Sequence, residues 1–120
     1  MDHTIHKTEF KKAVIYNLKI SYRRTIEDAT AAQMYQAVAL AVKDMIIDRW
    51  IATHKEYEKQ DAKVVYYMSM EFLTGRFLGN NIISLCEQEE IREALAEMGF
   101  DLNTIENQER DPALGNGGLG

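Results

Sequence analysis

Apolar side chains recur at every fourth residue near the start of the chain, the spacing that puts them on one face of an α-helix. The pattern covers residues from about Thr8 to Tyr22 and predicts one helix there. The apolar face of this helix consists of Phe10, Val14, Ile15, Leu18 and Tyr22. A short polar connection, residues 23–29, follows it.

A second, longer helix is predicted from Thr30 to about Lys59. Thr30 and Gln33 match a capping box, in which each side chain accepts a hydrogen bond from the backbone of the other residue. The apolar positions that follow are Met34, Val38, Val42, Ile46 and Trp50, widened by Tyr35, Met45 and Tyr57. At 1.5 Å per residue this helix is roughly 44 Å long. A small domain needs less to cover its own core, so we expect the helix to pack against further protein.

The period breaks at residues 61–63, and a different pattern begins. Residues 64–70 are mostly β-branched or aromatic and carry almost no charge, which predicts a strand buried on both faces. No convincing second strand follows, so we expect its sheet partners outside these 120 residues. We therefore expect the chain to be the opening piece of a larger protein.

The remaining residues predict short helices. Residues 78–85 and 87–98 form two of them, and Gly99 suits the position just after the second. Asp101 is expected to cap a brief turn, and residues 107–112 form a polar loop. The predicted fold class is thus mostly α-helical with one buried β-strand. We divide the chain into an N-terminal helical region, 1–60, and the start of an α/β domain, 61–120.

Composition restricts the function classes. The net charge of −5, with 14 Lys and Arg residues scattered apart from Arg23 and Arg24, argues against nucleic acid or an anionic membrane as the main partner. No apolar run approaches the roughly 20 residues of a membrane span. The single Cys86 cannot form an internal disulfide, which favours a reducing, cytoplasmic location, and we expect it to be a small buried hydrophobe. The three histidines are too dispersed for a metal site.

Glycine is concentrated at the end of the chain, where Gly115 to Gly120 satisfy the pattern G-x-G-x-x-G. Glycine permits positive φ angles and close approach of the backbone to a ligand, and free backbone amides bind phosphate. A dinucleotide site would need a strand directly before the first glycine, and residues 110–114 do not resemble one. A phosphate-binding loop and a plain loop both remain open on this evidence.

A second group of polar residues follows the predicted strand. Ser69, Glu71 and Arg76 lie at or just past its C-terminal end, where open α/β sheets bind their ligands. The alternative is that Glu71 and Arg76 pair with each other and have a structural role only. The residues by themselves do not decide between the two.

Together these segments resemble the glycogen, starch and maltodextrin phosphorylases. The resemblance rests on V-V-Y-Y-M-S-M-E-F-L-T-G-R at 64–76, on D-P-A-L-G-N-G-G-L-G at 111–120, and on Asp48 to Ile51 of the long helix. It extends from about Phe10 to Gly120. Two motifs at the family's spacing make it far more specific than the glycine pattern alone.

The resemblance implies phosphorolysis of α-1,4-glucan, in which orthophosphate cleaves the terminal glucosyl unit to give α-D-glucose 1-phosphate. It implies an α/β glycosyltransferase fold of the GT-B type, a homodimer, and pyridoxal 5′-phosphate bound to a lysine outside this chain. Asn116, Gly117, Gly118 and Leu119 correspond to the loop that lines the glucosyl and phosphate subsites, with Gly118 the first choice for an amide contact to phosphate. Glu71 falls near the cofactor pocket, and Arg76 supports it. No residue of the chain is identified as catalytic, and the chain alone should be inactive.

The sequence departs from the animal members of the family at two places. It shows no basic segment around a serine before Thr8. An arginine and a tyrosine of the animal AMP site correspond to Ala52 and Glu58, and loss of the cation should abolish phosphate binding there. We therefore expect a bacterial-type enzyme that AMP does not activate.

Two other functions remain as alternatives. One is a free-standing module that binds a nucleotide or sugar phosphate through Gly115–Gly120. The other is a small helical interaction protein whose long helix dimerises.

Overall fold

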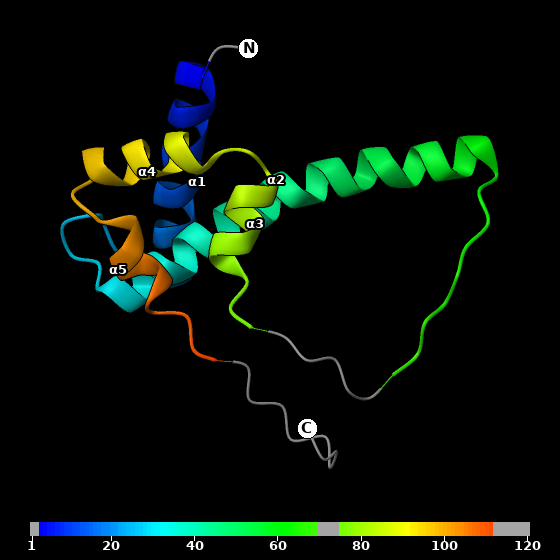
Figure 1. Cartoon of the computed structure of the whole chain (residues 1–120). Coiled ribbons are helices and arrows are strands. Elements are labelled where there is room, and N and C mark those ends of the chain that lie inside the picture. The colour runs from blue at the N-terminus through cyan, green and yellow to red at the C-terminus, as the bar shows by residue number, and fades with distance from the viewer. Residues whose placement is uncertain (1–2, 70–74, 112–120) are drawn as a thin grey trace.

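The computed structural model describes residues 3–69 and 75–111 of the chain (Figure 1). Five α-helices form there: α1 (His3–Tyr22), α2 (Ala31–Gln60), α3 (Leu78–Ser84), α4 (Gln88–Glu97) and α5 (Leu102–Glu106). No strand is present in the described residues. Nor does any helix among them combine the length and apolar character that a membrane crossing requires.

Both predicted long helices are confirmed. The first begins earlier than predicted, at His3, and ends at Tyr22. The second begins with the predicted capping box: the Gln33 amide donates to the Thr30 hydroxyl at 3.2 Å, and the Thr30 amide donates to the Gln33 side-chain oxygen at 3.1 Å. These two bonds satisfy backbone donors that a helix start otherwise leaves unpaired.

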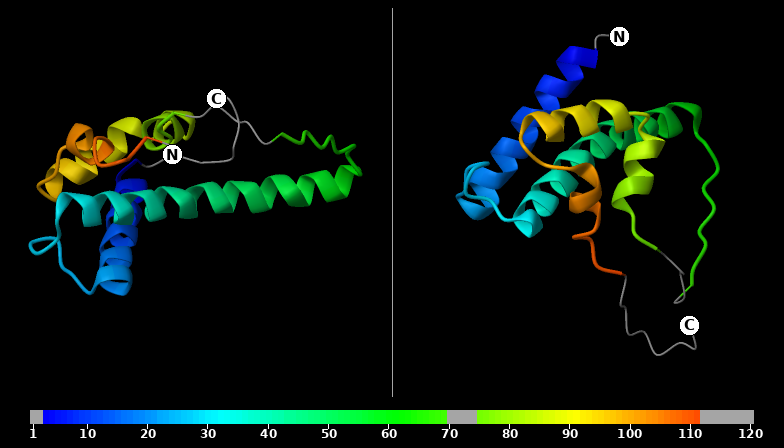
Figure 2. Two further views of the ribbon diagram at one scale, coloured as in Figure 1. Left: turned by 90° about the horizontal axis from the view of Figure 1, so that it is seen from below. Right: turned by 60° about the vertical axis from the view of Figure 1, so that its left-hand side comes forward.

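One hydrophobic core joins all five helices. The fully buried side chains include Val14 and Leu18 of α1, Met34 and Val38 of α2, Ile82 of α3, Ile91 and Leu95 of α4, and Leu102 and Ile105 of α5. Figure 2 shows α1, α4 and α5 gathered at the end of α2 that begins at Ala31, with α3 beside its middle. Ion pairs from Lys7 to Glu93 and Glu97, and from Lys11 to Glu97, join α1 to α4 at the surface.

The second half of α2 extends beyond this core (Figure 1). Every residue from Asp48 to Gln60 is exposed, although the apolar pattern continues there. At the boundary between the two halves, the Arg49 guanidinium donates to the Leu85 carbonyl, just after α3, at 3.4 Å. The helix is therefore packed in its first half and bare in its second.

The predicted buried strand is wrong over the described residues 64–69. This segment has no regular secondary structure, and the side chains from Val64 to Met68 are 62–90% exposed. Residue 70 lies outside the described residues. β-branched and aromatic residues favour a strand only when another strand accepts their backbone hydrogen bonds, and the described residues provide none.

Gly99 ends α4 in the predicted way. Its φ of 87° is left-handed, the Gly99 amide donates to the Ala96 carbonyl, and the Phe100 amide donates to the Leu95 carbonyl at 2.8 Å. These are the two bonds of a Schellman motif. The brief helix after Asp101 is also present, but the Asp101 side chain makes no capping hydrogen bond.

The expectation that Cys86 is buried is wrong, because its side chain is exposed. Cys86 follows α3 with φ of 61°, and the Glu87 amide donates to the Ile82 carbonyl behind it. Cys86 thus occupies a helix-ending position that usually holds glycine. That turn directs its side chain away from the core.

Candidate functional site

The two sequence motifs approach each other at the start of α3. The guanidinium of Arg76, at the end of the first motif, donates from Nε to Asp111 Oδ1 at 3.4 Å and from Nη1 to Asn107 Oδ1 at 3.4 Å. Asp111 is the last described residue before the glycine-rich sequence. Arg76 therefore links the end of the first motif to the start of the second.

Glu109 makes the strongest contacts of this region. The Phe77 amide donates to Glu109 Oε1 at 2.8 Å, and the Leu78 amide donates to Glu109 Oε2 at 3.0 Å. The residue at the start of α3, Phe77, has no side chain that could accept these bonds. A carboxylate from 31 residues further along the chain supplies the cap instead. Such charge-assisted bonds are worth about 1.5–3 kcal/mol each, and the negative charge suits the positive end of the helix.

Tyr35 of α2 adjoins the same carboxylate. Burial raises the pKa of the Tyr35 phenol above its usual value of 10.0, and the negative charge of Glu109 raises that pKa further. Both residues line two cavities of about 730 and 190 Å³, together with Phe77. Three elements thus meet here: the packed half of α2, the start of α3 and residues 107–111.

Ser69 is described and exposed, and the other site residues that the sequence singled out lie outside the described residues. These are Glu71, which precedes Arg76, and Asn116, Gly117, Gly118 and Leu119, which follow Asp111. Of the predicted site residues, the structure therefore places only Ser69 and Arg76, and Arg76 pairs with Asp111 and Asn107.

Sequence reasoning missed Asn107, Glu109 and Asp111, which it assigned to a polar loop. One signal was available. The helix predicted from Leu78 has no Ser, Thr, Asp or Asn directly before it, so its first amides needed an acceptor from elsewhere.

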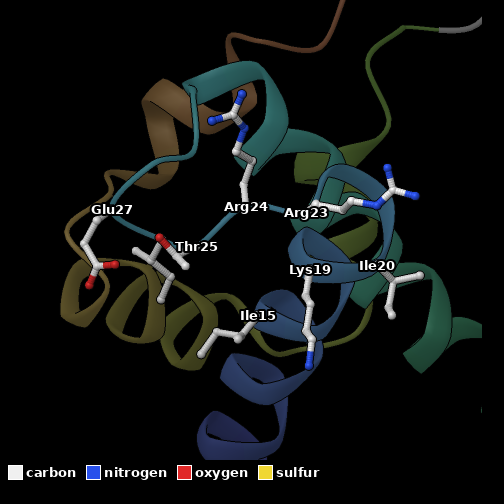
Figure 3. Close-up of a pocket in the computed structure, with 8 residues that line it drawn as sticks. Ile15, Lys19, Ile20, Arg23, Arg24, Thr25 and Glu27 are labelled. Atoms are coloured by element: carbon white, nitrogen blue, oxygen red, sulfur yellow. The ribbon is translucent and has the colours of Figure 1, made fainter.

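A further cavity lies between the last turns of α1 and residues 23–27 (Figure 3). Its volume is about 770 Å³, and its lining combines isoleucines with Lys19, Arg23, Arg24 and Glu27. Figure 3 shows that the three cationic side chains point in different directions. They do not converge on one point, so they do not form a single anion site.

A pyridoxal phosphate site would need a lysine for the Schiff base and converging donors for the phosphate. Lys19 lines the cavity of Figure 3, but Arg23 and Arg24 diverge from it. This cavity therefore does not fit the cofactor. The described residues contain no group of His, Cys, Asp and Glu side chains that could hold a metal ion.

Comparison with known proteins identifies the class of enzyme to which this helical segment is related. The chain is homologous to the N-terminal region of the glycogen phosphorylases. It is 38% identical over 113 residues to "Glycogen phosphorylase, muscle form" of Ovis aries, a match that covers 94% of this chain. It is 39% identical over 110 residues to "Glycogen phosphorylase" of Haemophilus influenzae and 36% identical over 110 residues to that of Pasteurella multocida.

These matches span 13% of the length of each relative. Animal and bacterial relatives are equally similar to the chain, so identity does not separate the two types. No model of a known protein family matches the chain.

Proposed function

We propose that the gene product containing this chain is an α-1,4-glucan phosphorylase, which uses orthophosphate to release α-D-glucose 1-phosphate from glucan ends. The observation that carries the proposal is the similarity to glycogen phosphorylases over 94% of the chain. The hydrogen bonds of Arg76 and Glu109 hold the end of the first motif beside the start of the second. They support the proposal, because a phosphate-binding loop needs a rigid support.

In this proposal Asn116, Gly117, Gly118 and Leu119 line the glucosyl and phosphate subsites. Backbone amides, above all that of Gly118, hold an oxyanion without side-chain bulk or a further titrating group. Glu71 lies near the cofactor pocket, and Arg76 supports the segment that carries it. Pyridoxal phosphate, the homodimer contacts of the proposed GT-B enzyme, and its cytoplasmic location remain part of the proposal. The chain alone is expected to be inactive.

The test is to purify the gene product and incubate it with glycogen and orthophosphate. Glucose 1-phosphate should form, and omission of orthophosphate should abolish it. Gly118→Ala keeps the backbone amide but adds a Cβ where the oxyanion is proposed to approach closely. The rate should fall about tenfold or more, since impairment of one oxyanion contact costs at least that much in other enzymes. Glu89→Gln, an exposed substitution in the first turn of α4, is the control, and the rate should not change.

Absence of glucose 1-phosphate would reject the proposal. If the product instead binds a nucleotide or sugar phosphate through the glycines, the binding-module alternative replaces it. We also infer from Ala52 and Glu58 that the enzyme is of the bacterial type. A several-fold activation by AMP would contradict this.

A further inference from the structure

We propose that Arg76, Asn107, Glu109 and Asp111 form a positioning latch, which holds the backbone that enters the glycine-rich sequence against the start of α3. The inference rests on the proposed function, because the sequence so positioned is the proposed phosphate-binding loop. None of the four residues is proposed to touch substrate. Their role is to fix where the loop begins.

The Glu109 carboxylate is the rigid part of the latch. Each of its oxygens accepts from a different backbone amide, at 2.8 and 3.0 Å. Two bonds to consecutive backbone groups fix the carboxylate in position and in rotation, whereas a single bond would leave it free to swing. The backbone at residue 109 is thereby held to the first turn of α3.

The Arg76 contacts fix the path of the backbone more than they stabilise the fold. Both distances are 3.4 Å, and the side chains of Arg76 and Asp111 are 44% and 86% exposed. Exposed pairs of this kind contribute about 1 kcal/mol or less. Arg76 nevertheless reaches two residues on either side of Glu109, which sets the path of the chain through 107–111.

Both sides of the latch are anchored in the core. Leu78, whose amide binds Glu109, is 4% exposed, and Ile105, just before the 107–111 segment, is 0% exposed. Tyr35 of the packed half of α2 also faces Glu109 across their shared cavities. Residues 107–111 are therefore held to the helical core from both sides.

Covalent reach shows what the latch controls. Glu71 is five residues before Arg76, and Gly118 is seven residues after Asp111. At about 3.6 Å per residue, these two positions lie within roughly 18 and 25 Å of their anchors. A shift of the anchors moves the whole region that either segment can occupy.

The first experiment separates positioning from simple helix capping. Glu109→Gln in the gene product keeps the size of the side chain but leaves one carbonyl oxygen where two carboxylate oxygens accepted. Small displacements of positioning groups cost about a hundredfold in rate, so kcat/KM for orthophosphate should fall about ten- to a hundredfold. The KM for glycogen and the melting temperature should change little by comparison.

Glu89→Gln is the matched control. Glu89 is also a glutamate in the first turn of a helix, α4, but it is exposed and accepts no hydrogen bond from another described residue. The kinetic constants of the Glu89→Gln variant should not change. If Glu109→Gln leaves kcat/KM for orthophosphate within about twofold of the unaltered enzyme, the latch does not position the loop, whereas the proposed function stands.

The second experiment does not depend on activity. In the 120-residue chain, Glu109→Gln should accelerate hydrogen exchange of the Phe77 and Leu78 amides about tenfold or more, the effect of losing a charge-assisted bond. It should also shift the NMR signals of the amides of Gly115 to Gly120, and Glu89→Gln should do neither. Unchanged glycine signals would overturn the latch. If the unaltered gene product makes no glucose 1-phosphate, the proposed function fails, and this experiment alone decides on the latch.

Discussion

The two halves of α2 share one helix and one apolar pattern, yet they lie in different surroundings. In the first half, Met34 and Val38 are fully buried, and the helix contacts α1, α3 and α5. In the second half, Trp50 continues the same stripe and is 62% exposed. Periodicity therefore shows which face of a helix is apolar, but it does not show whether anything covers that face.

The bare half also differs in what stabilises it. Most helices in proteins depend on tertiary packing of their apolar face, and beyond Arg49 the described residues provide none. The exposed segment from Val64 to Met68 adds to the uncovered apolar surface. Large apolar surfaces of this kind mark contacts with further protein, which agrees with a chain that spans 13% of its relatives. The following substitutions test the contrast between the two halves.

The largest expected difference is between two methionines. Met34 in the packed half is 0% exposed, and Met68 in the bare region is 90% exposed. Met34→Ala should lower the free energy of unfolding by about 2–5 kcal/mol, because it leaves a cavity in the core. Met68→Ala should change that free energy by less than about 0.5 kcal/mol. Urea denaturation, monitored by circular dichroism, measures both free energies of unfolding. Similar losses of stability in the two variants would contradict the contrast.

A smaller effect is expected from glycine in the two halves. Ala41 is buried and Ala52 is exposed. Ala41→Gly should cost about 1 kcal/mol of global stability, the difference in helix propensity. Ala52→Gly weakens the helix by the same local amount, but the bare half can open without unfolding the core. Hydrogen exchange should therefore accelerate from Asp48 to Gln60 while the urea midpoint stays in place.

A lower urea midpoint for Ala52→Gly would show that the two halves unfold together. The assignment of the bare half as an independent unit would then be wrong.

The sequence predicted those parts of the fold that depend on neighbours along the chain. The start of α2 depends on Thr30 and Gln33, three residues apart, and both hydrogen bonds are present. The end of α4 depends on Gly99, whose left-handed φ is confirmed. Local patterns of this kind contain the whole physical cause of the feature, so sequence alone suffices.

The features that depend on distant partners were missed or wrongly predicted. The strand at 64–69 required a second strand, which the described residues lack. The cap on α3 comes from Glu109, and no periodicity relates that residue to Phe77. For the candidate site, the sequence therefore indicated Arg76 but not its partners Asn107 and Asp111.

The smallest expected effect concerns Tyr35, on the packed half of α2. Its pKa is raised above 10.0, first by burial and then by the charge of Glu109. In the unfolded chain the phenol loses its proton near 10.0, whereas in the folded chain it keeps the proton to higher pH. Folding stability from this group is therefore complete below pH 10.0 and is lost as the pH rises above it.

Glu109→Gln should remove the effect of the Glu109 charge on the pKa of Tyr35 and leave the effect of burial. The Tyr35 titration should then move to lower pH but stay above 10.0. Since the chain has six tyrosines, the Tyr35 signal is the difference in tyrosinate absorbance between each protein and its Tyr35→Phe variant. Glu89→Gln should not move this titration. A Tyr35 titration that Glu109→Gln leaves unchanged would mean that the carboxylate does not adjoin α2, and the packed half of α2 would then not support the latch.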